Sequence, residues 1–185
     1  MSNTKSKTLR MILCAFFAAL IAVGAFLRIP VPLVPFTLQF FFTMLAGLLL
    51  GGKYGALSVL VYILLGLAGL PVFANGGGIG YIFQPSFGYL IGFVFGTYAT
   101  GTIAHKAGKL SYKRLLAANF TGLLIVYACG TVYCYLISNF YLDTGITLWP
   151  LFLYCVLLPI PGDIVLCILS IFLAKRLIPI IGRMG

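Results

Sequence analysis

The sequence predicts an all-α integral membrane protein in which six transmembrane helices form a bundle, as one membrane domain. Of its 185 residues, 62% are hydrophobic and only 8% are charged, and the mean hydropathy is +1.15. Soluble domains carry about 25% charged residues. Because one spanning helix needs about 20 apolar residues, a chain of this length has room for about six. The first expected partner is therefore the lipid bilayer.

Apolar length, interrupted by Gly, Pro and charged residues, places the six spans. They cover residues 9–27, 36–50, 54–70, 85–104, 115–140 and 149–178. The first run is longer than the apolar core of a secretory signal, so we expect an uncleaved span. The second and third runs are separated only by GGKY, which predicts a tight helical hairpin.

The last apolar run is too long for one straight crossing. From Trp149 to Lys175 there are 27 residues, about 40 Å of helix against a hydrocarbon core of about 30 Å. Pro159 and Pro161 mark the expected break, because proline lacks a backbone N–H. Asp163 then lies in the first turn of the helix that restarts.

The basic residues predict the orientation. Eleven Lys and Arg residues fall on one side of the predicted spans and Arg28 alone falls on the other, so both termini should be cytoplasmic in a multi-pass protein of the cell membrane. The eleven are Lys5, Lys7, Arg10, Lys53, Lys106, Lys109, Lys113, Arg114, Lys175, Arg176 and Arg183. Orientation accounts for the net charge of +10, and we expect no nucleic-acid partner.

Several kinds of chemistry are excluded by residue content. The five cysteines lie in apolar runs without a C-x-x-C pair, so we expect no metal site and no cofactor. The stretch GLLLGGKY, residues 47–54, imitates a phosphate-binding loop, but Tyr54 replaces the Ser or Thr that binds Mg²⁺. With two Asp, one His and no Glu, no acid–base pair can assemble, so we expect binding or transport and no enzyme.

The connection of residues 71–84 is the largest on the predicted outer side. Its glycines, which permit positive φ and close approach to a ligand, are Gly76, Gly77, Gly78 and Gly80. Asn75, Tyr81 and Gln84 offer polar contacts nearby. We predict a lid over an outward-facing site; a flexible connector is the alternative.

Three further polar residues are candidates for the site. An acid in lipid costs at least about 2.5 kcal/mol, so Asp163 indicates a ligand site, with capping of its own helix as the alternative. Gln39 lies at the outer end of the second span, where an amide serves a pocket or an interhelical bond. Arg28 is either a pocket residue for an anionic group or an interface anchor.

Small residues recur at helical spacing in two spans. They are Gly88, Gly92 and Gly96 in the fourth span, and Ala15 with Ala19 and Ala18 with Ala22 in the first. Such ridges let helices approach closely in lipid. The glycines predict internal packing, whereas the alanines serve either the bundle or the docking of another protein.

Four ordered motifs are distinctive in combination: VPFTLQ (34–39), GLAGLPVFANGGG (66–78), FGYLIGF (87–93) and PGD (161–163). Together they resemble the BioY family, the biotin-binding S components of energy-coupling factor (ECF) transporters. The resemblance implies a six-helix bundle with a biotin pocket near its extracellular side, closed by the loop after the third helix. It also implies partners, namely a membrane-embedded coupling protein and two cytoplasmic ATPases, which dock at a ridge that Ala15 and Ala19 match.

The resemblance also implies roles for site residues. The ureido group of biotin needs an acceptor and donors, which Asp163, Asn75 and Gln39 offer. Its apolar rings need aromatic walls, for which the candidates are Tyr81, Phe83, Tyr89 and Tyr154. Many members carry Lys where this chain has Leu166, so the group that meets the ligand carboxylate stays open among Arg28, backbone amides and a protonated Asp163.

Three other functions remain open from the sequence. One is an S component for another vitamin. The second is an autonomous proton-coupled carrier that cycles Asp163 through protonation. The third is a structural membrane protein, which would bind no small molecule and would tolerate Asp163→Asn.

Overall fold

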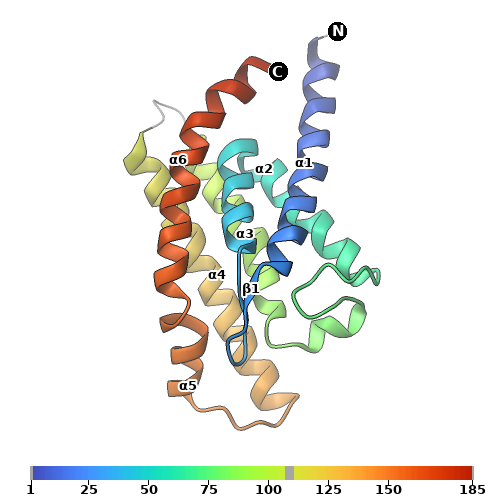
Figure 1. The fold of residues 1–185 in the computed structure, drawn as a ribbon, viewed down its shortest axis with the longest axis vertical. Coiled ribbons are helices and arrows are strands. Elements are labelled where there is room, and N and C mark those ends of the chain that lie inside the picture. The colour runs from blue at the N-terminus through green and yellow to red at the C-terminus, as the bar shows by residue number, and fades with distance from the viewer. Residues whose placement is uncertain (1, 107–110, 185) are drawn as a thin grey trace.

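The protein is a multi-pass membrane protein built from helices (Figure 1). The computed structural model describes residues 2–106 and 111–184. Within those residues five helical segments are long and apolar enough to cross a membrane. They are α1 (Ser2–Phe26), α2 (Gln39–Leu67), α3 (Phe87–Ala104), α4 (Tyr112–Phe140) and the segment Leu148–Ile180.

Helix α2 bends back on itself at Gly51, which has φ 80° and ψ 172°. A Cβ added to Gly55 would lie 2.8 Å from the Cα of Gly47, whereas residues eight apart in a straight helix are separated by about 12 Å. The two arms of α2 therefore lie side by side. They correspond to the predicted spans 36–50 and 54–70, and the turn lies at the predicted GGKY.

The last membrane segment is broken where the prolines predict a break. It consists of α5 (Leu148–Phe152), the π-helical turn η2 (Leu153–Leu157) and α6 (Ile160–Met184). The amide of Leu158 donates to the carbonyl of Leu153 at 2.9 Å, five residues back, because the wider turn replaces α-helical bonding ahead of Pro159. Asp163 lies in the first turn of α6.

Two connections complete the part of the fold that carries the site. Strands β1 (Arg28–Ile29) and β2 (Phe36–Thr37) form an antiparallel hairpin in which Arg28 pairs with Thr37. Residues 68–86 join α2 to α3 and contain the short 3₁₀ helix η1 (Ile79–Phe83). Both connections lie away from the two chain termini (Figure 1).

Glycines set the close packing of α3 against α4. A Cβ added to Gly92 would lie 2.9 Å from the Cα of Val126, and one added to Gly96 would lie 2.9 Å from the carbonyl oxygen of Gly122. No side chain larger than hydrogen fits there without moving a backbone. The predicted glycine ridge therefore lies inside the bundle.

The alanine ridge of α1 divides between two faces. Ala15 and Ala19 are exposed, whereas Ala18 is only 5% exposed in the hydrophobic core and Ala22 packs partly buried against it. Successive residues of an α-helix are about 100° apart, so Ala18 lies about 60° around the helix from Ala15 and about 100° from Ala19. Ala18 is thus inaccessible to a docking partner and serves the bundle, one of the two roles that the sequence leaves open for these alanines, whereas Ala15 and Ala19 stay on the surface.

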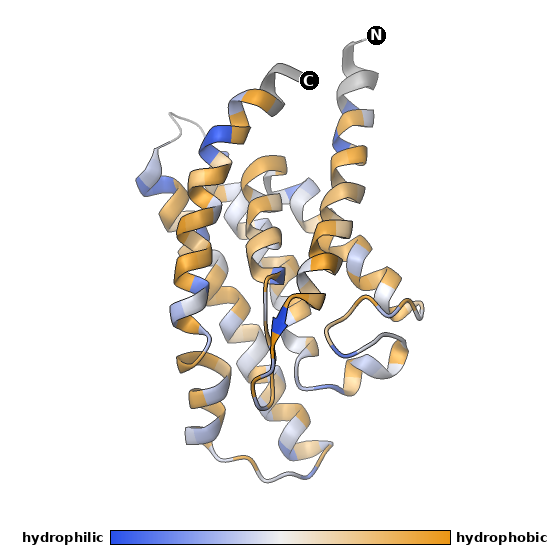
Figure 2. Ribbon diagram, viewed as in Figure 1, coloured by the Kyte–Doolittle hydropathy of each residue, from blue (hydrophilic) through white to orange (hydrophobic). Residues whose placement is uncertain are grey.

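Many of the most hydrophilic residues lie in the half of the molecule that carries both termini, and apolar residues make up most of the helices (Figure 2). Lys53, Lys106 and Lys113 are among the exposed basic residues. Lys109 lies outside the described residues, as do the side chains of Lys5 and Arg183.

Candidate functional site

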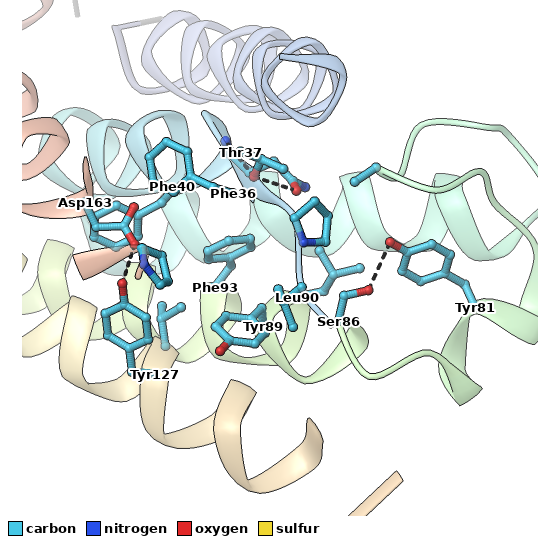
Figure 3. Close-up of a pocket in the computed structure, with 16 residues that line it drawn as sticks. Phe36, Thr37, Phe40, Tyr81, Ser86, Tyr89, Leu90, Phe93, Tyr127 and Asp163 are labelled. Carbon is cyan, nitrogen blue, oxygen red and sulfur yellow. Dashed lines mark hydrogen bonds between the residues drawn. The ribbon is translucent and has the colours of Figure 1, made fainter. Parts of the chain in front are cut away.

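A pocket opens among α2, α3, α4, α6 and the two connections (Figure 3). Sixteen residues line it: Val34, Pro35, Phe36, Thr37, Gln39, Phe40, Ala74, Tyr81, Ser86, Tyr89, Leu90, Phe93, Val126, Tyr127, Pro159 and Asp163. Segments far apart in the sequence therefore build one concave surface, which is lined mainly by apolar and aromatic side chains with a few polar groups. This composition is typical of a small-molecule site.

The acid lies at one end of the pocket, paired with a phenol. Asp163 is 7% exposed, and its Oδ2 accepts a 2.6 Å hydrogen bond from the hydroxyl of Tyr127 on α4. A capping carboxylate accepts from the first-turn amides of its own helix, whereas this one is bonded to another helix. The pair gives the pocket a strong hydrogen-bond acceptor in an apolar setting.

Tyr81 and Ser86 lie toward the other end (Figure 3). Both are buried, and the hydroxyl of Ser86 donates to that of Tyr81 at 3.2 Å. Burial raises the pKa of Tyr81, so its phenol stays neutral at physiological pH. This end of the pocket therefore offers two uncharged hydroxyl groups.

Gln39 combines both roles that the sequence leaves open for it. Its side chain lines the pocket, and its Nε2 donates to the hydroxyl of Tyr62 at 2.7 Å. Tyr62 in turn donates to the carbonyl of Val72 at 3.1 Å, and Gln39 Oε1 accepts from Thr37 Oγ1 at 3.1 Å. The chain of bonds joins the start of α2, its second arm and the loop 68–86.

Aromatic rings line the pocket between its two polar ends (Figure 3). Phe36, Phe40, Tyr89 and Phe93 line this part of the pocket. The hydroxyl of Tyr89 donates to the carbonyl of Cys155 at 2.7 Å, so this phenol is already paired and its ring forms part of the wall. The pocket suits a ligand with polar ends and an apolar middle.

Five residues predicted at the site do not line the pocket: Asn75, Phe83, Gln84, Tyr154 and Arg28. The Nη1 of Arg28 donates to the carbonyl of Ala74 and to Oδ1 of Asn75, so these residues bond to each other. Phe83 is exposed and stacks on Tyr141 with ring centroids 4.6 Å apart. A 3₁₀ helix has three residues per turn, so Phe83 cannot share the face of Tyr81, two positions earlier. Gln84 and Tyr154 are half-buried elsewhere.

Several lining residues escape sequence reasoning. Tyr127 carries a usable signal, because its hydroxyl stands in the middle of the apolar run 115–140 and needs a partner in lipid. Phe36, Phe40 and Phe93 carry none, since phenylalanine faces lipid and pockets alike. Leu166, at the position where the resemblance predicts Lys, is buried in the core outside the pocket lining.

The predicted lid loop is held by a buried phenylalanine. Phe73 is 1% exposed and its ring packs against Tyr62 and Tyr81, at centroid distances of 5.4 and 4.5 Å. A Cβ on Gly66 would lie 2.1 Å from that ring. The absence of a side chain at Gly66 therefore leaves the space that the Phe73 ring occupies. Beyond Phe73, two loop glycines have positive φ, 115° at Gly76 and 96° at Gly78.

The cysteines lie in or beside the apolar core. Cys134 and Cys155 are both fully buried, with their Sγ atoms 3.5 Å apart. Among residues 2–106 and 111–184, no three His, Cys, Asp or Glu side chains are grouped closely enough to hold a metal ion. The polar side chains that line the pocket carry hydroxyl, amide and carboxyl groups.

Comparison with known proteins decides the family. The family model described as "BioY family" matches residues 1–183. The chain belongs to the BioY family. A probable biotin transporter BioY from Lysinibacillus sphaericus is 47% identical over 173 residues, which cover 94% of this chain and 88% of the relative. The biotin transporter BioY of Thermotoga maritima is 47% identical over 133 residues, 71% of this chain and 75% of the relative.

Comparison with solved structures identifies a protein with the same fold. The crystal structure of the S-component for biotin from an ECF-type ABC transporter matches with a TM-score of 0.78 and 30% sequence identity. The match covers 96% of this chain and 93% of that chain. The helical arrangement in Figure 1 is therefore that of an ECF S-component.

Proposed function

We propose that this BioY-family chain binds biotin with high affinity and takes it up across the bacterial cytoplasmic membrane as the S component of an ECF-type ABC transporter. The observation that carries the proposal is the pocket itself, with the Asp163–Tyr127 pair, at 2.6 Å, at one end of an aromatic-lined space. Relatives 47% identical to this chain are named biotin transporters.

The ligand matches the pocket in chemistry. Biotin carries a ureido group with two N–H donors, an apolar fused ring and a carboxylate at the end of an aliphatic chain. We place the ureido N–H groups at the carboxyl of Asp163, the rings between Phe40, Tyr89 and Phe93, and the carboxylate toward Ser86. Leu166, at the position where the resemblance predicts Lys, lies outside the pocket lining, so in this placement a neutral hydroxyl meets the carboxylate.

The proposed topology has six spans in one membrane domain, with each arm of α2 crossing once and both termini in the cytoplasm. The hydrophilic residues in the half of the molecule that carries the termini support it, because cytoplasmic ends are enriched in Lys and Arg. The proposed partners are a membrane-embedded coupling protein and two cytoplasmic ATPases. Ala15 and Ala19, exposed on α1, are the proposed docking positions.

Calorimetric titration of biotin into the detergent-solubilised protein tests the ligand. Asp163→Asn should weaken binding at least tenfold, about 1.4 kcal/mol, because the amide presents a weaker acceptor and a competing donor to the ureido group. Asp143→Asn, which changes an exposed acid on the loop after α4, is the matched control and should bind like wild type. Failure of wild type to bind biotin while it binds another vitamin, for example thiamine, would refute the biotin assignment.

Reconstitution into liposomes separates a partner-dependent subunit from an autonomous carrier. The purified chain alone should accumulate no biotin when a pH gradient is imposed, and uptake should require the coupling protein, both ATPases and ATP. Accumulation driven by protons in the absence of partners would instead support the carrier that cycles Asp163.

A further inference from the structure

We propose that Arg28 is a latch that fastens the loop 68–86 to the β1–β2 hairpin and thereby slows the escape of ligand from the pocket. The inference rests on the proposed biotin function for its ligand. Its structural basis is the guanidinium of Arg28, whose Nη1 donates to the carbonyl of Ala74 and to Oδ1 of Asn75, 46 and 47 residues along the chain.

These contacts join two segments that each form part of the pocket wall. The hairpin and the residues just before α2 supply Val34, Pro35, Phe36 and Thr37, and the loop supplies Ala74, Tyr81 and Ser86. Arg28 pairs with Thr37 across the hairpin, and Ala74 both lines the pocket and accepts from Arg28. The hydrogen bond from Arg28 to Ala74 therefore connects the hairpin side of the pocket wall to the loop side.

The loop 68–86 is fixed at two points, and Arg28 contacts the turn between them. Phe73 is fixed in the core, and the amide of Gly78 donates to the carbonyl of Gly66 at 2.7 Å. Between these anchors, Ala74 and Asn75 form a turn closed by the backbone bridge between Phe73 and Gly76. Arg28 supplies side-chain hydrogen bonds that tie this turn to the hairpin, so its loss frees the turn and leaves both anchors in place.

The acceptors of Arg28 are neutral, a carbonyl and a side-chain amide. The guanidinium donates both bonds from Nη1, whose N–H groups have a fixed planar geometry, whereas the three donors of a Lys ammonium rotate on a flexible stem. A latch of this kind acts on any ligand that fits the pocket. A direct contact between Arg28 and the ligand would act mainly on a ligand with a negative charge, because a hydrogen bond to an ionised acceptor is about twice as strong as one to a neutral acceptor.

The experiment therefore compares a charged ligand with an uncharged one. Dissociation rates of biotin and of its uncharged primary amide are measured by stopped flow for Arg28→Ala, Arg28→Lys and Asn75→Ala. Lys53→Ala is the control, because it removes an exposed cation at the turn of α2 beside Gly51 and Gly52. Arg28→Ala should raise both dissociation rates about tenfold, which corresponds to about 1.4 kcal/mol, with Arg28→Lys and Asn75→Ala intermediate and Lys53→Ala unchanged.

Two outcomes would overturn the latch. An effect of Arg28→Ala on biotin but not on its amide would show a direct contact with the carboxylate, and equal rates in variant and wild type would show that Arg28 restrains nothing. If wild type binds no biotin, the proposed function fails. The latch can then still be tested in the ligand-free protein by hydrogen exchange. Hydrogen exchange of peptides covering residues 70–80 should then be faster in Arg28→Ala than in Lys53→Ala, and equal exchange would refute the latch.

Discussion

Two polar side chains of the pocket are bonded to partners far along the chain. Asp163 on α6 accepts from Tyr127 on α4, and Gln39 at the start of α2 donates to Tyr62 on its second arm. A buried polar group without a partner is costly in an apolar medium. These bonds therefore stabilise the bundle and at the same time hold the acceptor and donor groups of the pocket in place.

The hydroxyl of Tyr127 can be removed without changing the size of the ring. Tyr127→Phe should lower the unfolding free energy by about 1–3 kcal/mol, because the buried carboxyl of Asp163 loses its donor. Thermal unfolding in detergent measures the effect. Tyr98→Phe changes an exposed tyrosine of α3 and should leave the melting temperature unchanged; an equal fall in both variants would contradict this role for Tyr127.

Sequence reasoning finds the pocket residues whose polarity conflicts with their surroundings. Asp163 and Gln39 stand in apolar runs, and the structure brings both to the pocket together with Tyr81 and Tyr89. Asn75 and Arg28 are polar residues in connections, where polarity is ordinary, and they bond to each other instead. Ligand contact by the four pocket residues is still a prediction, which the titration tests for Asp163.

At the scale of elements, two local sequence features set where helices reverse or break. Gly51 lets α2 reverse direction, and the prolines before Asp163 end the turn η2 and start α6. The apolar runs gave the spans to within a few residues, for example 85–104 against Phe87–Ala104. Hydropathy locates a helix well because the bilayer requires the same apolar length of each crossing.

The turn of α2 depends on a backbone conformation that is essentially restricted to glycine. At φ 80° and ψ 172°, Gly51→Ala should cost about 1–3 kcal/mol of unfolding free energy, measured as a lower melting temperature in detergent. Gly80→Ala is the matched control, because an added Cβ there meets no atom within 4 Å and φ is not positive. Equal melting temperatures for the two variants would argue against strain at Gly51.

At the scale of the whole molecule, the proposed topology places the turn of α2 and the termini on one side of the membrane. Single cysteines at Lys53, Lys113 and Asp143 test it in intact cells with a membrane-impermeant maleimide. Asp143→Cys should be labelled from outside, whereas Lys53→Cys and Lys113→Cys should be labelled only after the cells are opened. Wild type is the control, because its own cysteines lie in membrane-spanning segments, four of them buried.

Labelling of Lys53→Cys from outside would show that the first arm of α2 starts on the cytoplasmic side, which would contradict the six-span topology. Labelling of Lys113→Cys from outside would reverse the later helices. Either result would also move the mouth of the pocket relative to the membrane and would require a different direction of ligand entry.

The sequence by itself determined that the chain resides in a membrane, where its helices lie, where the last segment breaks and that an acid stands just after the break. These properties follow from composition and backbone chemistry over short stretches. The tertiary structure decided which side chains meet, because those contacts join residues far apart, 36 positions for Tyr127 with Asp163 and 47 for Arg28 with Asn75. Such contacts depend on how helices pack and rotate against one another, and hydropathy does not encode helix rotation when almost every face is apolar.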